Sequence, residues 1–169
     1  EYYETTAHAG ARPSHAEWQG RVFKIHGSSP DYPNFVDSTG YGSGSGLCGW
    51  NCRHSFYPYW PGISSPAYSK ERLAEYDRAK YSYNGDMLTD YECSQIQRAY
   101  EREIREIKRI LSSYDAAMQE SRSKAQIQCI QEDFTSESVK LKKKERELKN
   151  FCNDTNRSYD SARTQVVAY

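Results

Sequence analysis

Histidine and cysteine side chains gather in two short stretches of this 169-residue chain. Motif 1, residues 8–20, reads His-Ala-Gly-Ala-Arg-Pro-Ser-His-Ala-Glu-Trp-Gln-Gly, and motif 2, residues 46–54, reads Gly-Leu-Cys-Gly-Trp-Asn-Cys-Arg-His. Imidazole and thiol groups bind metals, transfer protons and act as nucleophiles. Because the remaining sequence has the composition of an ordinary scaffold, we expect any functional site to lie in these two motifs.

Metal binding is the first chemistry that the motifs could perform. Cys48, Cys52 and His54, together with His15 or His8, supply up to four nitrogen and sulfur ligands, the set that zinc takes in tetrahedral sites, and His15 is the histidine chosen from motif 1. The Cys-x3-Cys spacing differs from that of a usual zinc knuckle, and no second close cysteine pair follows. Two other interpretations therefore stay open, namely buried hydrogen-bonded side chains and a disulfide between the two cysteines. A structural zinc ion is the one cofactor that these residues suggest.

The same residues make a weaker case for catalysis. A thiolate–imidazole pair could form between Cys52 or Cys48 and His15 or His54, and Cys52 and His15 are the candidate catalytic residues. No cysteine-protease signature surrounds them. The Gly/Ser-rich stretch at 42–46 lacks the clear flanking strand, helix and lysine of a phosphate-binding loop, so we expect a positioned loop instead. The chain is therefore more simply explained as a protein that is not an enzyme.

The other unusual residues of the motifs have structural interpretations. A buried arginine can tie loops together by donating to several carbonyl groups, and this is the expected role of Arg12 and Arg53. Trp18 and Trp50 are expected to anchor the core rather than to bind a ligand. The full set of structural motif residues is His8, Arg12, Trp18, Gly20, Asn51 and Arg53.

Composition argues against several classes of function. The chain has 23 Lys and Arg residues and 23 Asp and Glu residues, so its formal net charge is zero. Broad electrostatic binding to nucleic acid needs an excess of basic residues, and the basic run at 142–144 is interpreted as a solvated helix face. No apolar run approaches the ~20 residues of a membrane span. The five cysteines are odd in number and mostly widely spaced, so they do not indicate a disulfide framework, which fits synthesis in a reducing cytoplasm.

Short elements are predicted to position the motifs in the N-terminal part, residues 1–65. The expected strands lie at 2–6, 21–24 and 54–61, and the expected helical turns lie at 13–19 and 34–38. A connector, residues 66–89, follows. It contains Asn84-Gly85 between two short strands, which predicts a β-hairpin with a type I′ turn.

A helical hairpin is predicted for residues 90–155. The first helix starts at a capping box formed by Thr89 and Glu92, and its apolar residues recur every three or four positions. Ser136 is expected to cap the second helix. Two helices with narrow apolar stripes should pack antiparallel, and their charged outer faces are compatible with self-association. Residues 156–169 would form a C-terminal tail, and the fold class is α+β in one domain with a helical arm.

Long stretches of the chain resemble one protein family. Residues 8–23, 39–59 and 61–64 are similar to the minor capsid protein 2 family of tailed phages. The similarity continues through shorter segments at 83–85, 91–92, 95–98, 101–102, 107–109, 115–117, 139–141 and 159–166. The family's proteins are longer, so this chain resembles their C-terminal portion. Its stretch 119–134 is longer than the usual connection between the family's helices.

The resemblance implies a function in the phage head and no known reaction. It implies a minor structural protein of the virion, made in the bacterial cytoplasm and associated with the portal or the major capsid protein during assembly. A weaker similarity is to Mu-type head-morphogenesis proteins, whose Arg-x-x-His and Asn-Cys-Arg-Cys patterns match Arg12–His15 and Asn51–His54. His54 stands where that pattern has its last cysteine.

Two other functions stay open as alternatives. Some Mu-type head proteins carry effector domains, so the first alternative is an ADP-ribosyltransferase-like enzyme that uses His8 or Arg12 together with Glu92. The second alternative is a module that contacts nucleic acid during packaging or ejection. The neutral net charge of the chain speaks against this second alternative.

Overall fold

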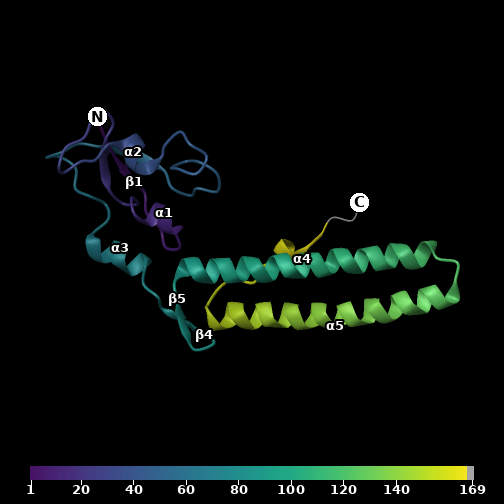
Figure 1. The fold of residues 1–169 in the computed structure, drawn as a ribbon. Coiled ribbons are helices and arrows are strands. Elements are labelled where there is room, and N and C mark those ends of the chain that lie inside the picture. Colours follow the sequence, from purple (N-terminus) through teal and green to yellow (C-terminus); the bar gives the residue numbers. More distant parts are fainter. Residues whose placement is uncertain (167–169) are drawn as a thin grey trace. The chain divides into compact units, whose positions relative to one another are not determined.

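The chain folds into two units, which a computed structural model describes over residues 1–166 (Figure 1). Unit 1 consists of residues 1–80 and 89–91, and unit 2 consists of residues 81–88 and the chain from residue 92 onward. The last three residues of the predicted tail, 167–169, lie outside the described part. Helices combined with short antiparallel strands confirm the predicted α+β class.

A three-stranded antiparallel sheet forms the frame of unit 1. Strand β1 (Tyr2–Thr5) lies in the middle, between β2 (Val22–Lys24) and β3 (Phe56–Tyr59). Tyr3 pairs with a residue of β2 on one side and with Pro58 of β3 on the other. A proline cannot donate a hydrogen bond to a neighbouring strand, which fits its position on an edge strand. All three strands occur where the sequence predicts them.

Three short helices complete unit 1. Helix α1 (Pro13–Ala16) has a proline at its first turn, and α2 (Phe35–Thr39) is capped by the side chain of Asn34. Both lie where helical turns are predicted. Helix α3 (Lys70–Tyr76) lies in the predicted connector and was not expected, although Ser69 caps it with its hydroxyl group. The signal for this helix is a serine followed by residues of good helix propensity.

The core of unit 1 is mainly aromatic. Its buried residues are Trp18, Phe23, Phe35 and Leu47, and Tyr3, Ile25, Cys52 and Phe56 pack against them. Trp18 is 5% exposed and anchors this core, as predicted. The same prediction for Trp50 is wrong, because its side chain is 78% exposed. The surface loop turns so that the Trp50 ring lies outside, against Gly44, where an added Cβ would come within 2.9 Å of the indole.

Unit 2 is built on two long helices, α4 (Asp90–Glu120) and α5 (Lys124–Asp154), which run antiparallel (Figure 1). Its buried core consists of Cys93, Ile104, Leu148, Phe151 and Cys152. Ion pairs between Lys108 and Glu145 and between Lys144 and Glu103 also join the two helices. None of residues 112–147 is buried, so the core of unit 2 lies at the end of the helices far from their connection. No helix in the described residues is long and apolar enough to cross a membrane.

The predicted β-hairpin is confirmed. It consists of β4 (Tyr81–Tyr83) and β5 (Asp86–Leu88), which pair antiparallel. The turn residues Asn84 and Gly85 have φ angles of 51° and 91°, as a type I′ turn requires. Tyrosine side chains of β4 pack against the core of unit 2, so the hairpin belongs to that unit.

The start of the second long helix differs from the prediction. Ser136 was expected to cap α5, but α5 begins at Lys124, and only residues 121–123 connect the two helices. Most of the stretch 119–134, which is longer than the family's usual connection, is therefore helical, and the connection itself is short. The hydroxyl group of Thr135 donates to the carbonyl oxygen of Gln131 one turn earlier (2.7 Å), so this polar segment lies inside the helix.

After α5 the chain turns back along α4 and ends its described part there (Figure 1). The amide of Gln97 donates to the carbonyl oxygen of Ser158 (3.1 Å), and the guanidinium group of Arg157 donates to Gln97 and to Ser94 (both 2.8 Å). A short 3-10 helix, η1 (Ser161–Thr164), follows. These hydrogen bonds hold the C-terminal segment on α4 and satisfy the buried amide group of Gln97.

Candidate metal centre

Three side chains that can bind a metal, drawn from both motifs, meet in unit 1. His15 lies on α1, and Cys52 and His54 lie in the segment that leads into β3. Beyond the end of the sheet, Thr6 continues the pairing of β1 with this segment. Its backbone N–H donates to the carbonyl oxygen of Ser55 and its hydroxyl group accepts the N–H of Ser55, both at 2.8 Å. The sheet therefore holds motif 2 beside motif 1.

The Gly/Ser-rich loop after α2 places the cysteines of motif 2. A Cβ at Gly46 would lie 2.0 Å from the carbonyl oxygen of Gly40, and a Cβ at Gly49 would lie 2.4 Å from that of Gly44. No side chain fits at such distances, so only glycine lets the loop fold this tightly. The loop therefore has one tightly folded conformation, as predicted for a positioned loop. Its backbone packs closely against other parts of the same loop.

The three ligand atoms form a nearly equilateral triangle. The Nδ1 atoms of His15 and His54 lie 3.4 Å apart. The Sγ atom of Cys52 lies 3.7 Å from Nδ1 of His15 and 3.6 Å from Nδ1 of His54. Both histidines are buried and Cys52 is half-buried. Within residues 1–166, no other group of His, Cys, Asp or Glu side chains brings three ligand atoms together in this way.

Hydrogen bonds on the far side of each imidazole ring decide which nitrogen carries the proton. Nε2 of His15 lies 2.9 Å from the carbonyl oxygen of Ser45, and Nε2 of His54 lies 3.1 Å from Oε1 of Gln19. Oε1 also accepts the backbone N–H of His8 (3.1 Å), which identifies it as the amide oxygen. Both partners are acceptors, so both Nε2 atoms are protonated. Both Nδ1 atoms therefore present lone pairs toward Cys52.

Burial keeps both imidazole rings neutral. The pKa of His54 is lowered to about 4, mainly by burial and to a smaller extent by the neighbouring histidines and arginines. Burial also lowers the pKa of His15, although the hydrogen bond to Ser45 acts in the opposite direction. A neutral imidazole is the form that binds a metal ion.

Two further residues of the motifs border the triangle. The Sγ atom of Cys48 lies 3.6 Å from the carbonyl oxygen of His54, and Sγ of Cys52 lies 3.9 Å from the same oxygen. Both cysteines are free thiols rather than a disulfide. Cys48 is exposed as a residue, and the partial desolvation of its sulfur, with a smaller effect of Cys52, raises its pKa. The His8 ring stacks on the His54 ring with centroids 4.3 Å apart.

The remaining motif residues act at the edge of the site. Arg12 donates from Nη2 to the carbonyl oxygen of Trp50 (2.7 Å), so it ties motif 1 to motif 2 in the way predicted for a loop-binding arginine. Arg53 is exposed, and within the described residues no hydrogen bond of its side chain links two loops. Asn51 has a φ of 54°, in the left-handed region that asparagine tolerates better than most residues. Gly20 also has a positive φ, and an added Cβ there would lie 2.7 Å from a side chain of α3.

Sequence reasoning missed two groups of this site. Gln19 is 1% exposed and orients His54, and the backbone carbonyl of Ser45 orients His15. Gln19 lies inside motif 1, so its position next to Trp18 was a signal that could have been used. The carbonyl of Ser45 carries no signal in the sequence, because every residue has one.

The arrangement suits metal binding better than nucleophilic catalysis. A reactive cysteine needs an accessible thiolate stabilised by a nearby positive charge. Cys52 instead packs against the aromatic core of unit 1, beside two imidazole rings that burial keeps neutral. One sulfur and two nitrogen lone pairs that converge on one point are the donor set of a soft or borderline cation such as zinc.

Comparisons with known proteins agree with the resemblance seen in the sequence. The family model for phage minor capsid protein 2 matches residues 1–153. A structural protein of Lactococcus phage LL-H is 36% identical over 108 residues, which make up 61% of this chain and 26% of that protein. A structural protein of Lactococcus phage mv4 is 37% identical over 80 residues, 47% of this chain and 55% of that protein. No solved structure matches the chain.

The chain thus spans about a quarter and about half of the length of these two relatives. The family match covers both motifs, all of unit 1 and nearly all of the helical hairpin. On this match the chain is a phage structural protein, and it belongs to the phage minor capsid protein 2 family.

Proposed function

We propose that this chain acts in head morphogenesis, where it associates with the portal or the major capsid protein as the head assembles. It is made in the bacterial cytoplasm and stays in the head of the finished virion. The family match over residues 1–153 carries the proposal, and the two similar phage structural proteins support it.

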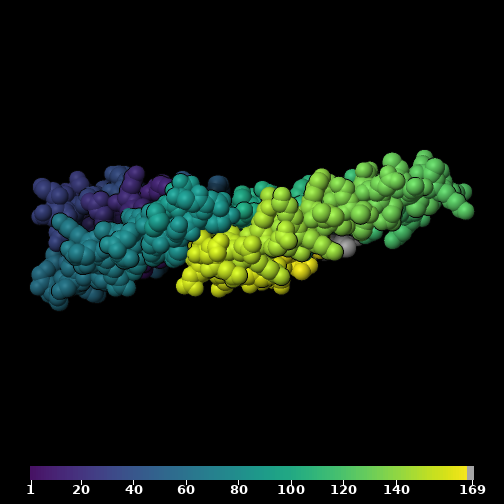
Figure 2. Space-filling model, turned by 90° about the horizontal axis from the view of Figure 1, so that it is seen from below, coloured from purple at the N-terminus to yellow at the C-terminus, as the bar shows by residue number. Residues whose placement is uncertain are grey.

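The half of the helical hairpin near the connection of α4 and α5 is the surface that we assign to this contact. Residues 112–147 have no buried member, and Val139 is 64% exposed. On the face seen in Figure 2, no other segment of unit 2 covers the green end of the two helices. Amphipathic helices commonly bind partners by laying a partly apolar face into a groove.

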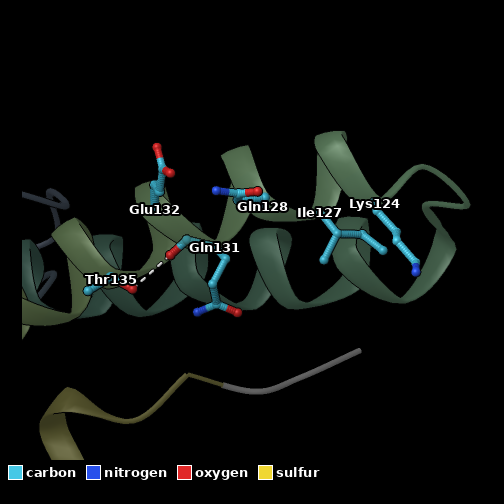
Figure 3. A pocket seen from close by; sticks show the side chains of 6 residues that line it. All are labelled: Lys124, Ile127, Gln128, Gln131, Glu132 and Thr135. Carbon is cyan, nitrogen blue, oxygen red and sulfur yellow. Dashed lines mark hydrogen bonds between the residues drawn. The ribbon is translucent and has the colours of Figure 1, made fainter.

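A shallow pocket on α5 marks the same end of the hairpin (Figure 3). Its volume is about 630 Å³, and it is lined by Lys124, Ile127, Gln128, Gln131, Glu132 and Thr135. Ile127 supplies a large apolar group, and the carbon chains of the five polar residues add further apolar surface. A side chain of a partner protein is therefore the kind of occupant that the pocket fits.

The test of this proposal uses the phage that encodes the chain. Gradient-purified virions are analysed by mass spectrometry, and the tagged chain is co-produced with the portal protein and, separately, with the major capsid protein. We expect the chain in the virions and capture of one of the two partners. Absence from the virions, or capture of neither partner, would contradict the proposal.

Two variants test the assigned surface. Ile127→Glu combined with Val139→Glu places charge at half-buried Ile127 in the pocket and at exposed Val139, and we expect capture of the partner to fall at least tenfold while helix content is unchanged. Ile63→Glu in unit 1 is the matched control, because Ile63, like Val139, is an exposed apolar side chain and is 85% accessible. Loss of capture in the control alone would show that the contact lies elsewhere.

Self-association through the hairpin is a second use of the same surface, and sedimentation equilibrium of the purified chain tests it. A concentration-dependent dimer that the double variant abolishes would support it.

The comparisons lend no support to the ADP-ribosyltransferase alternative.

A further inference from the structure

We propose that unit 1 binds one Zn²⁺ ion through Nδ1 of His15, Sγ of Cys52 and Nδ1 of His54, with the thiolate of Cys48 as the fourth ligand. This inference goes beyond the assembly function and does not depend on it. It is carried by the geometry of one cluster of side chains in unit 1.

The triangle of ligand atoms has the dimensions of one face of a zinc tetrahedron. Typical Zn–N and Zn–S bonds of about 2.05 and 2.3 Å place two nitrogens about 3.3 Å apart, and a nitrogen and a sulfur about 3.6 Å apart. The two Nδ1 atoms of the cluster lie 3.4 Å apart, and its sulfur lies 3.6 and 3.7 Å from them. The spacing of these three ligand atoms therefore already matches that of a bound ion.

The proton positions of the two histidines also point to a cation. Ser45 and Gln19 hold the protons on the Nε2 atoms, so both buried Nδ1 atoms are acceptors. A thiol proton on Cys52 can serve one of these nitrogens and not both. The other nitrogen would have a buried lone pair without a donor, which folded proteins usually avoid. A cation at the centre satisfies all three atoms at once.

The partners of the Nε2 atoms are those that metal-bound histidines typically have. Such histidines donate their second ring N–H to a carbonyl or carboxylate oxygen, which fixes the orientation of the ring. His15 donates to a backbone carbonyl and His54 to a side-chain amide oxygen, at 2.9 and 3.1 Å. Trp18 packs against both rings, with centroids 4.6 and 4.9 Å away, and shields them from water on that side.

Cys48 is placed to supply the fourth ligand. Its sulfur lies 3.6 Å from the same carbonyl oxygen of His54 that lies 3.9 Å from the sulfur of Cys52. Cys48 is exposed, so its side chain can rotate toward the open face of the triangle. Two thiolates and two imidazoles make a closed, structural zinc site and disfavour the hard cations Mg²⁺ and Ca²⁺.

The first experiment measures the metal in the full chain. The protein is produced in zinc-containing medium, dialysed and analysed by mass spectrometry for metal content, and the metal-free chain is titrated with Co²⁺. We expect one zinc per chain and, with cobalt, the absorption of a tetrahedral ion together with a sulfur-to-cobalt charge-transfer band. Less than a tenth of an equivalent of metal, or cobalt spectra of octahedral type, would overturn the proposal without any variant.

Variants then assign the ligands. Cys52→Ser and His54→Ala should lose the metal, and Cys48→Ser should weaken zinc binding at least tenfold. Cys129→Ser is the matched control, since Cys129 is an exposed free cysteine of unit 2, and it should bind zinc as the parent chain does. Zinc binding that survives Cys52→Ser unchanged would overturn the site. Unchanged affinity in Cys48→Ser together with loss in His8→Ala would overturn the assignment of the fourth ligand.

Discussion

At the scale of single residues, Gln19 connects two parts of the site through one oxygen atom. That atom accepts a hydrogen bond from the ring of His54 and another from the backbone of His8. Gln19→Ala should reduce zinc affinity about 10- to 100-fold, because a metal ligand loses the partner that orients it. Gln19→Glu keeps an acceptor oxygen in place and should retain affinity closer to that of the parent chain.

A competitive titration against a chromophoric chelator measures both affinities. The free energy of unfolding of each metal-free variant serves as the control for a purely structural effect. Equal zinc affinity in Gln19→Ala and the parent chain would show that the hydrogen bond to His54 does not support metal binding.

The tryptophans of the two motifs give a second prediction at this scale. Trp18 is 5% exposed in the aromatic core, so Trp18→Ala should lower the free energy of unfolding by about 3–5 kcal/mol. Trp50 is 78% exposed, and the bond from Arg12 goes to its backbone carbonyl, which alanine retains. Trp50→Ala should therefore change stability by no more than about 0.5 kcal/mol. Urea denaturation of both variants checks this, and equal losses would contradict it.

The residue types that could build the site were predictable, and their partners were not. His15, Cys52 and His54 were selected because imidazole and thiol groups are chemically specialised. The sequence does not show that Trp18 is buried and Trp50 exposed. Trp18 stands next to a glutamine and Trp50 next to a glycine, and neither neighbour indicates burial. Only the tight fold of the loop decides which indole faces the core.

At the scale of elements, the glycine-rich loop carries the cysteines and sets the position of the carbonyl of Ser45. Gly46→Ala should disrupt it, because the new Cβ would collide with the backbone of Gly40. We expect a loss of at least about 2 kcal/mol in the free energy of unfolding and weaker metal binding. Ser45→Ala is the neighbouring control, since it keeps the backbone carbonyl that His15 uses. Similar behaviour of the two variants, in denaturation and in metal content, would refute this account of the loop.

The start of α5 gives a second prediction at this scale. Proline inside a helix removes a hydrogen bond and clashes with the preceding turn, at a cost of about 3 kcal/mol or more, whereas the first turn tolerates it. Ser136→Pro should therefore destabilise unit 2 strongly, and Lys124→Pro at the first position of α5 should have little effect. Circular dichroism and thermal unfolding distinguish the two. A mild effect of Ser136→Pro would restore the shorter helix that the sequence predicted.

The sequence predicted the hairpin of helices and the β-hairpin before it but misplaced the start of α5. Asn84-Gly85 and the apolar stripe of α4 follow local rules, so they were recognisable. Ser136 resembled a helix cap because a serine precedes Leu141, yet no signal marks the true start, where Ser123 makes no capping hydrogen bond with its side chain. The segment 124–135 has no buried residue and is helical as the uninterrupted start of α5, because each residue added to an existing helix gains one hydrogen bond.

At the scale of the whole molecule, the unfolding of each unit can be followed by a different spectroscopic signal. Trp18, Trp50 and Trp60, which are the three tryptophans of the chain, all lie in unit 1. Most helical residues belong to α4 and α5, each 31 residues long, whereas the helices of unit 1 have four, five and seven residues. Tryptophan fluorescence therefore follows unit 1, and far-ultraviolet circular dichroism follows unit 2.

Removal of zinc should separate these two signals. A ligand that binds only the folded state at about 1,000 times its Kd contributes about 4 kcal/mol to stability. A strong chelator should therefore lower the midpoint of the fluorescence transition by many degrees, while the transition seen by circular dichroism stays in place, because the core of unit 2 contains none of the proposed ligands. Cys52→Ser should show the low fluorescence midpoint with or without chelator. If both transitions move together, the two units unfold cooperatively, and if neither moves, zinc does not stabilise unit 1.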